Sequence, residues 1–521
     1  DEGVAMVRRL RGMFAIALWD SVRRVLWLIR DRLGIKPLYY AEFGGTVAFA
    51  SELPVLRKAL PAVSIRPQAI AEYLNLLYVP GPETVFSGIR HLEPGEILKL
   101  EAGKKTLQKY FDLPTRAKDE SGELADVSPA DFRDLLRETV RAHLVSDVPL
   151  GLFLSGGLDS GSILAMMRTV TDGTIRTFSI GYEAEADAGF NELAASRLLA
   201  ERFGAVHTEE RLRPDAVELL PRIVRAMGEP FADSSAIPTY LVSELTAKSV
   251  KVALSGIGGD ELFGGYPRYL GMRAANRYRR LPRWIRRMMA SAVAPMLHEK
   301  GVQPDRTGRF KRFLKTGLLP LEQQYLRWIT FLPPEWGNTA FSSDFRSQVD
   351  AAAVERAYGA AFATWPSSVP SDQAMGLDLQ TYLPDDLLRM GDRLSMAHSL
   401  ELRVPFCDHE LLSLALRVPA GRRLQGWRLK GFMRQALEPV LPRGTLQQPK
   451  LGFMVPLARW LREDLRDMVG DLLSEQNTRR RGYLNPAYVQ WLISEHASGR
   501  RNFSDQLFSL LALELWLSQS G

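Results

Sequence analysis

The stretch VPLGLFLSGGLDS, residues 148–160, passes from an apolar strand through a serine- and glycine-rich turn into a helix. Glycine lets the backbone turn its N–H groups toward an anion, and the start of a helix adds a favourable dipole. Ser155 and Ser160 add hydroxyl donors to this turn. The turn lacks the lysine of a Walker A loop. A carboxylate beside bound phosphate requires a cation, so Asp159 predicts a bound Mg²⁺ ion.

A second stretch, VALSGIGGDELFGGY at residues 252–266, repeats this arrangement of strand, serine, glycines and aspartate. Ligands of open α/β sheets bind where the strands end, so two such loops in one sheet can face one site. We therefore expect Asp159 and Asp260 to share magnesium. Short glycine motifs are weak signals, and a plain strand-to-helix turn is the alternative for either loop alone.

The chain around both loops alternates between strand and helix patterns. This alternation predicts a parallel sheet of the doubly wound kind. Beyond about residue 265 the pattern is almost entirely helical, and Pro384 with Asp385 and Asp386 predicts the start of a helix. Strands are expected at 148–154, 175–180, near 206 and at 250–254, helices at 132–144, 160–170, 191–203 and 237–248, and the apolar stripe of the later helix at Leu387, Met390, Leu394 and Ala397.

The first 115 residues have a different pattern. Apolar runs at 14–19, 25–29 and 47–50 predict strands that are buried on both faces, as in a layered sandwich. A helix is expected at 67–78. The polar stretch 112–128 is the expected linker.

Composition limits the class of protein. The 521 residues suggest two to four domains, and 46% hydrophobic with 24% charged residues excludes a disordered chain. The single cysteine, Cys407, excludes an intrachain disulfide and a Cys-ligated zinc site and fits a reducing, cytoplasmic compartment. The most apolar run, 507–517, is too short to span a membrane.

Charge gives little sign of a polyanionic partner. A net charge of +7, taken as spread over the whole chain, is too mild to indicate nucleic acid. Residues 277–287 mix arginines with Tyr278 and Trp284, which is a pattern that could contact RNA or an anionic membrane. We expect instead a solvated helical face with two core aromatics, and neither nucleic acid nor a membrane as partner.

Taken together, the two loops resemble those of the glutamine-hydrolysing asparagine synthetases. Further stretches are similar to the glutaminase half, the synthetase helices and a late lysine loop of that family. These stretches are RGMFA at 11–15, RDRLGIKPLY at 30–39, DR at 392–393, ELRVPF at 401–406 and PKLGF at 449–453.

The resemblance implies an α/β enzyme with two parts. Residues 1–115 would be a truncated Ntn-type αββα glutaminase remnant, and residues 129–521 a doubly wound ATP-pyrophosphatase domain with a helical C-terminal region. The implied reaction converts aspartate to asparagine through an acyl-adenylate. It uses ATP, Mg²⁺ and either glutamine or ammonia, and releases AMP and pyrophosphate. The implied partners are these small molecules, and a homodimer stays open.

The resemblance also implies roles for individual residues. Asp159 and Asp260 would hold the metal, and Lys450 would stabilise charge while the amide forms. The implied ATP-binding residues are Leu154, Ser155, Gly156, Gly157, Asp159, Ser160, Ile180, Ser255 and Gly256.

Two departures from the family pattern affect the expected activity. The family's N-terminal cysteine has no counterpart, because Asp1 aligns near the middle of the glutaminase domain and Cys407 is expected to be a small buried hydrophobe. We therefore expect this chain to contain no glutaminase nucleophile and to use free ammonia. Ile257 stands where asparagine-forming enzymes often have glutamate, so a natural-product or cell-envelope acceptor stays open beside aspartate.

Overall fold

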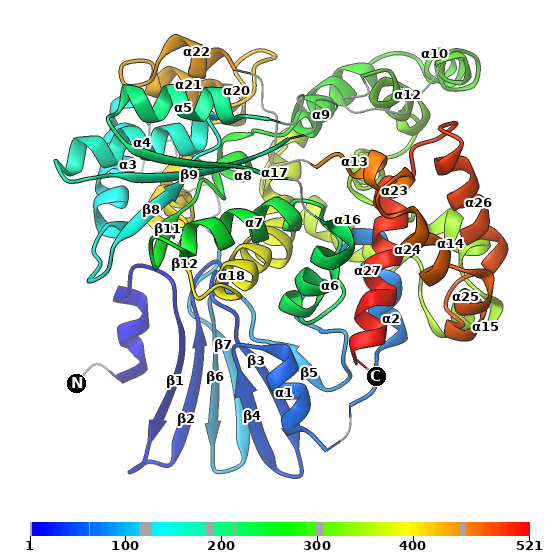
Figure 1. Cartoon of the computed structure of the whole chain (residues 1–521), viewed down its shortest axis with the longest axis horizontal. Coiled ribbons are helices and arrows are strands. Elements are labelled where there is room, and N and C mark those ends of the chain that lie inside the picture. The colour runs from blue at the N-terminus through cyan, green and yellow to red at the C-terminus, as the bar shows by residue number, and fades with distance from the viewer. Residues whose placement is uncertain are drawn as a thin grey trace.

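The computed structural model describes residues 3–61, 63–113, 127–183, 191–212, 215–297, 306–448 and 455–520. It is a mixed α/β fold in which two antiparallel sheets lie at one end and a parallel sheet with its helices lies above them (Figure 1). Most of the expected linker, residues 114–126, falls outside the described residues.

The parallel sheet contains five strands in the order β10-β9-β8-β11-β12. Each neighbouring pair runs parallel, which confirms the expected parallel sheet. The sequence did not predict β12, because its three residues alternate charged and apolar and give no apolar run. The strands are β8 (Leu150–Phe153), β9 (Arg176–Tyr182), β10 (Val206–Leu212), β11 (Val252–Leu254) and β12 (Glu401–Arg403).

Helices cover both faces of this sheet. Leu152 and Leu254 belong to a core cluster with α3 and α4, whereas Phe178 and Ala253 pack with α7. Side chains alternate across a strand, so each face receives its own apolar set. The helices before and around these strands are α3 (Pro129–His143), α4 (Leu158–Val170), α5 (Leu193–Arg202), α6 (Ala216–Met227) and α7 (Ala236–Ala247).

The first part of the chain folds into two antiparallel sheets, ordered β1-β2-β6-β7 and β4-β3-β5. The expected burial on both faces is wrong for β1, which exposes Leu18 and Trp19, and for β4, which exposes Phe49; both are edge strands, with a neighbouring strand on one side only. The elements are a 3₁₀ helix (Gly3–Arg9), β1 (Ala15–Asp20), β2 (Val25–Arg30), β3 (Tyr39–Phe43), β4 (Thr46–Ala50), α1 (Leu53–Ala59), α2 (Pro67–Leu76), β5 (Ile89–His91), β6 (Glu96–Glu101) and β7 (Lys104–Lys109).

After β11 the described chain is helical except for β12. Its helices are α8 (Gly259–Phe263), α9 (Pro267–Tyr278), α10 (Arg283–Met288), α11 (Ala294–Met296), α12 (Arg306–Thr316), α13 (Leu321–Ile329), α14 (Pro334–Ala340), α15 (Ser343–Gln348), α16 (Ala353–Thr364), α17 (Pro370–Gln380), α18 (Arg389–Met396), a 3₁₀ turn (Pro405–Cys407), α19 (His409–Arg417), α20 (Ala420–Arg423), α21 (Gly431–Leu437), α22 (Arg443–Gln447), α23 (Leu457–Arg462), α24 (Arg466–Leu472), α25 (Glu475–Arg481), α26 (Pro486–Ala497) and α27 (Ser504–Ser520).

The expected helix start at Pro384 is confirmed, because α17 ends at Gln380 and a new π-helical segment, Leu383–Leu388, begins with Pro384 in its first turn and leads directly into α18. The side chain of Asp385 is used in a tertiary contact rather than as a cap. Of the expected stripe, Met390 and Leu394 are buried and Leu387 is half-buried, but Ala397 is exposed because α18 ends at Met396.

The long apolar helix α27 belongs to the core. Its Glu514 forms an ion pair with Arg481, with Arg481 Nε 2.8 Å from Glu514 Oε2. Across the described part of the chain, no helix has the length and hydropathy needed to cross a bilayer.

Candidate active site

The first serine-glycine loop, residues 154–157, joins β8 to α4. Ser155 N donates to Ser160 Oγ at 3.2 Å, and the two serine hydroxyl oxygens lie 3.1 Å apart. Gly156 has φ +74°, and a Cβ there would meet Ala195 Cβ at 2.7 Å. Only glycine fits this position, so the bend of the loop depends on Gly156.

The second serine-glycine loop, residues 255–258, joins β11 to α8. Ser255 N donates to Arg403 O at 2.8 Å, which ties the loop to β12. Gly258 has φ +96°, and a Cβ there would meet the sulfur of Cys407 at 2.8 Å. Cys407 is therefore buried packing behind the loop, as expected, and burial raises the pKa of its thiol well above the ordinary value.

The two loops lie in contact. Their strands β8 and β11 are parallel neighbours, so both loops leave the same edge of the sheet. A Cβ at Gly256 would meet Asp159 Cβ at 2.8 Å, and one at Gly259 would meet Asp159 Oδ1 at 2.6 Å. The side chain of Asp159 therefore lies against the backbone of the second loop, and these glycines leave the space that it occupies.

Lys430 joins the two aspartates, which gives a group that we call the lysine cluster (Lys430, Asp159 and Asp260). Lys430 Nζ lies 2.6 Å from Asp159 Oδ1 and 2.6 Å from Asp260 Oδ1. The structure thus brings together the two carboxylates that the sequence predicted, around a cation that the sequence did not predict.

Lys430 is held in place from several sides. Its N–H donates to Gly264 O at 3.2 Å, and its φ of +54° is left-handed, a conformation that costs a non-glycine residue free energy. A Cβ at Gly265 would meet Lys430 Cε at 2.5 Å. Burial alone would lower the pKa of the lysine, but the charges of Asp159 and Asp260 outweigh burial and raise this pKa, so Lys430 stays protonated.

The remaining predicted residues lie at the same edge of the sheet, with one exception. Leu154 is buried and its N–H donates to Phe178 O at 2.9 Å, and Ile180 is half-buried on β9 beside it. Lys450 lies outside the described residues, so its role stays a prediction.

The donor set of the lysine cluster fits the expected Mg²⁺. Two hard carboxylate oxygens, one from each loop, already hold one cation. Mg²⁺ in nucleotide sites is commonly held by one or two carboxylates, with water and phosphate oxygens completing the octahedron. Among the described residues, no group of three or more His, Cys, Asp and Glu could hold a metal ion.

Ile257 of the second loop faces helix α18. A Cβ at Gly391 would meet Ile257 Cδ1 at 3.1 Å, so the isoleucine packs against this glycine. On the same helix, Met390 Sδ accepts a hydrogen bond from Ser235 Oγ at 3.4 Å, and Ser235 Oγ also lies 2.6 Å from Asp233 Oδ1. The position where the family often has a carboxylate is therefore apolar, and Asp233 is linked to the same helix through Ser235 and Met390.

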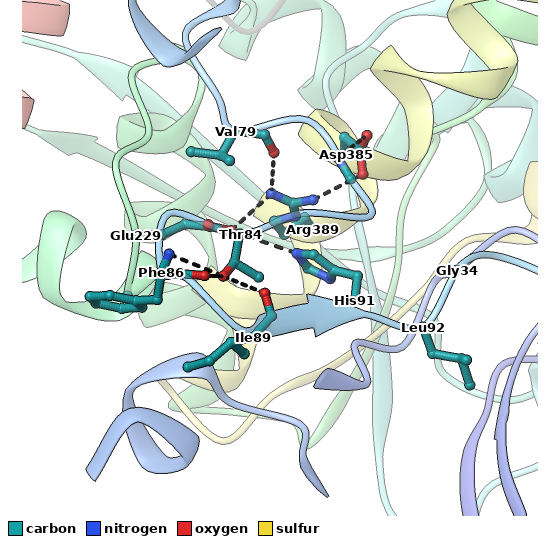
Figure 2. Close-up of polar contacts among 12 residues, drawn as sticks. Gly34, Val79, Thr84, Phe86, Ile89, His91, Leu92, Glu229, Asp385 and Arg389 are labelled. Carbon is teal, nitrogen blue, oxygen red and sulfur yellow. Dashed lines mark hydrogen bonds and ion pairs between the residues drawn. The ribbon is translucent and has the colours of Figure 1, made fainter. Parts of the chain in front are cut away.

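A second buried group of charges, which we call the arginine cluster, lies where the antiparallel sheets meet α18 (Figure 2). Arg389 donates to Val79 O, Glu229 Oε1 and Asp385 Oδ1, each at 2.9 Å. Asp385 Oδ2 accepts from Gly81 N at 2.9 Å. Burial raises the pKa of both Glu229 and Asp385, although Arg389 opposes this shift.

The RDRLGIKP stretch has a structural role in this arrangement. Asp31 accepts backbone N–H groups from Leu33, Ile35 and Lys36, which closes the turn after β2. The same Lys36 reaches Asp392 of α18 through its Nζ at 2.7 Å. The stretch therefore joins the first part of the chain to the helix that borders the second loop.

The sequence is similar to known protein families. Residues 131–518 match the sequence model of the asparagine synthase family, and residues 1–111 match the glutamine amidotransferase domain. A putative glutamine-hydrolysing asparagine synthetase of Mycobacterium tuberculosis is 35% identical over 540 residues, which covers 99% of this chain and 77% of the relative.

Two further relatives are less similar to this chain, and one of them is named as an amidase. Glutamine-hydrolysing asparagine synthetase 1 of Bacillus subtilis is 31% identical over 515 residues, which covers 98% of this chain and 78% of the relative. An amidase of Gibberella zeae is 25% identical over 539 residues, which covers 95% of this chain and 76% of the relative.

Proposed function

Given that the chain belongs to the asparagine synthase family and is a ligase that forms a carbon–nitrogen bond, we propose that it converts aspartate to asparagine and cleaves ATP to AMP and pyrophosphate. Glutamine or ammonia supplies the nitrogen. The observation that carries this proposal is the meeting of Asp159, Asp260 and Lys430 where two parallel strands end.

We assign the reaction to two parts of the chain. Residues 129–521 form the ATP-pyrophosphatase domain, and residues 1–115 form an Ntn-type glutaminase part. The parallel sheet with helices on both faces supports the first assignment, and the pair of antiparallel sheets supports the second. The arginine cluster and the Lys36–Asp392 pair would then fix the two parts against each other.

The first serine-glycine loop binds the phosphates of ATP in this proposal. Ser155, Gly156, Gly157 and Ser160 provide N–H and hydroxyl donors, because their backbone bends at Gly156 and opens onto the start of α4. The adenosine side of the site would be lined by Leu154, Ile180, Ser255 and Gly256.

Asp159 and Asp260 hold Mg²⁺, which when bound supplies positive charge for the phosphates. Lys430 provides a second positive charge at the same place, and its pKa keeps it protonated. Attack of the acceptor carboxylate on the α-phosphorus brings two anions together, so fixed positive charges and N–H donors lower the barrier. Once the carboxylate is adenylated, ammonia attacks the acyl carbon without a protein nucleophile, and Lys450 is assigned to charge stabilisation in that step.

A second acceptor remains a candidate because of one contact. Ile257 packs on Gly391 with no charge of its own, whereas an asparagine-forming site often has glutamate there. A natural-product or cell-envelope carboxylate is the alternative, and the relative named as an amidase fits it loosely.

Two measurements test the proposed function. Phosphorus NMR of a mixture with ATP, Mg²⁺, ammonium or glutamine, and aspartate should show AMP and pyrophosphate. Orthophosphate and ADP without AMP would contradict the adenylation. Mass spectrometry of the same mixture with a panel of carboxylates should show asparagine as the main product, and an amide formed only from another acid would favour the alternative acceptor.

A further inference from the structure

The positive charge of the chain is concentrated in one segment, which we call the basic arm (residues 277–316). It contains 12 of the 67 Lys and Arg residues and 2 of the 60 Asp and Glu residues. The basic arm alone therefore has a net charge of +10, and the rest of the chain has a net charge of −3. The expectation of a charge spread thinly over the chain is wrong.

The arm contains a continuous helical path from Arg283 to Met296, formed by α10, a π-helical turn and α11. One side of this path packs on the neighbouring segment, since Ala294 is buried and Arg286 donates to Gly317 O at 2.9 Å. Figure 1 shows α10 and α12 together at a corner of the molecule far from the antiparallel sheets.

The outward side of this path is apolar. Trp284, Met288, Ala292 and Met296 follow one another at intervals of four residues, which places them along one face of a helix. All four are exposed, with Trp284 at 68%, Met288 at 50% and Met296 at 75%. The expected core position of Trp284 is wrong, because the packed side of the helix is the opposite one.

Arginines flank this apolar row. Arg280, Arg283 and Arg287 are exposed, and none of them forms an ion pair with a carboxylate of the described residues. The arm thus combines an unpartnered row of Trp and Met side chains with a border of free positive charge. This combination is typical of helices that lie in the surface of an anionic membrane, with the apolar row in the acyl boundary and the arginines at the headgroups.

From this arrangement we infer that the helical path from Arg283 to Met296 docks the protein onto an anionic lipid surface, with Trp284 and Met288 inserted and Arg283 and Arg287 at the lipid phosphates. Charge and shape decide between the three possible partners of this surface, which are an anionic membrane, a second copy of the chain and RNA. A symmetric contact between two copies would bring the exposed Arg280, Arg283 and Arg287 of one copy against those of the other. RNA would satisfy the arginines but would leave the row of methionines in water, because bases stack on aromatic and not on aliphatic side chains.

Flotation of the whole chain with lipid vesicles tests this inference. Vesicles of phosphatidylcholine with about 30% phosphatidylglycerol should carry the protein upward, and vesicles of phosphatidylcholine alone should not. No flotation with the anionic vesicles at low salt would overturn the proposal. So would equal flotation with both kinds of vesicle.

Matched variants locate the binding surface. Trp284→Ala should weaken vesicle binding roughly tenfold, whereas Trp19→Ala, which removes another exposed tryptophan at the far sheet, should leave it unchanged. The pair Arg283→Glu and Arg287→Glu should weaken binding at least about thirtyfold. The control pair Arg479→Glu and Arg480→Glu changes the net charge equally and should have little effect.

Binding of RNA or of a second copy of the chain would give results that differ from those of membrane binding. Vesicle binding that is lost equally in both arginine pairs would mean a general effect of net charge and would overturn the role of the arm. Binding of an RNA oligomer without vesicle binding would also overturn the proposal. The same is true if the Trp284→Ala variant changes only the oligomeric state in light scattering. Amide formation from free ammonia should be unchanged in Trp284→Ala, so these outcomes are independent of the proposed function.

Discussion

The lysine cluster and the arginine cluster hold the same charges in different ways. Each places one buried cation between two carboxylates. In the lysine cluster the Asp159 side chain is 19% exposed and the cation is a lysine, whose ammonium has no fixed plane. In the arginine cluster the Glu229 side chain is 1% exposed and the Asp385 side chain is 16% exposed, and the flat guanidinium of Arg389 also donates to the backbone carbonyl of Val79.

This difference distinguishes the candidate active site, which is the lysine cluster, from a structural contact between the two parts of the chain. We call this contact, which is the arginine cluster, the joint. The carboxylates of the lysine cluster lie at the start of α4 and α8, directly after the two serine-glycine loops, and under the proposed function they would hold Mg²⁺ beside the ammonium of Lys430. The carboxylates of the arginine cluster are held by backbone groups such as Gly81 N and cannot change partners without breaking the contact between the two parts of the chain. Buried charge alone therefore does not identify an active site.

The largest effect that this comparison predicts is on turnover. Asp159→Asn and Asp260→Asn should each lower amide synthesis roughly a thousandfold, because a neutral amide removes charge where the phosphates react. The double variant should lose little more than either single variant, since both act on one cation. The initial rate of AMP release measures this.

The matched control comes from the other cluster. Asp385→Asn should keep turnover within about threefold of the wild type once the protein is folded, because Asp385 does not touch the loops. Near-normal turnover in Asp159→Asn, or a thousandfold loss in Asp385→Asn, would reverse the assignment of site and joint.

The second effect concerns stability. Arg389→Met should lower the free energy of unfolding by about 3–5 kcal/mol, because it leaves Glu229 and Asp385 buried without a counter-charge. Arg356→Met is the control, since Arg356 pairs with Asp350 at the surface and such pairs contribute little. Thermal unfolding at neutral pH measures both, and equal midpoints for the two variants would contradict the role of the arginine cluster.

The sequence predicted the meeting of Asp159 and Asp260 but not the arginine cluster, for a physical reason. The serine-glycine loops are local motifs, and the rule that parallel strands end at one edge was enough to bring Asp159 and Asp260 together. Lys430 is 271 residues from Asp159 along the chain. It lies outside both serine-glycine loops, so no local sequence pattern predicted that it would contact the two aspartates. Val79, Glu229 and Arg389 likewise meet only through the tertiary fold.

A third prediction concerns ligand binding and uses stability as its readout. Mg²⁺ with a non-hydrolysable ATP analogue should stabilise the wild type by about 2.7 kcal/mol at a hundredfold excess over the dissociation constant. Asp260→Asn should lose most of this gain, and Asp385→Asn should keep it. A thermal shift that is equal in Asp260→Asn and in the wild type would mean that the lysine cluster does not hold the metal.

The smallest effect is a pH dependence that comes from His91 in the arginine cluster. His91 packs against Tyr39 with the two rings tilted and their centroids 4.2 Å apart, and its Nε2 lies 3.9 Å from Glu229 Oε1. Burial lowers the pKa of His91 well below its ordinary value of 6.5, and the charges of Arg389 and Arg30 lower this pKa further. The histidine is therefore neutral in the folded protein over a range in which it is protonated in the unfolded chain.

The sign of the pH effect follows from this difference in pKa. The unfolded state binds more protons below pH 6.5, so the contribution of His91 is present above that pH and is lost as the pH falls. Between pH 6.5 and 5.5 the wild type should lose about 1 kcal/mol more than His91→Phe, which keeps the aromatic contact with Tyr39 but cannot titrate. Because Glu229 and Asp385 have raised pKa values and act in the opposite direction, the difference between variant and wild type is the quantity to measure. Parallel losses of thermal stability in the two proteins over this range would show that His91 is protonated in the folded state as readily as in the unfolded chain, and that the arginine cluster admits a further positive charge.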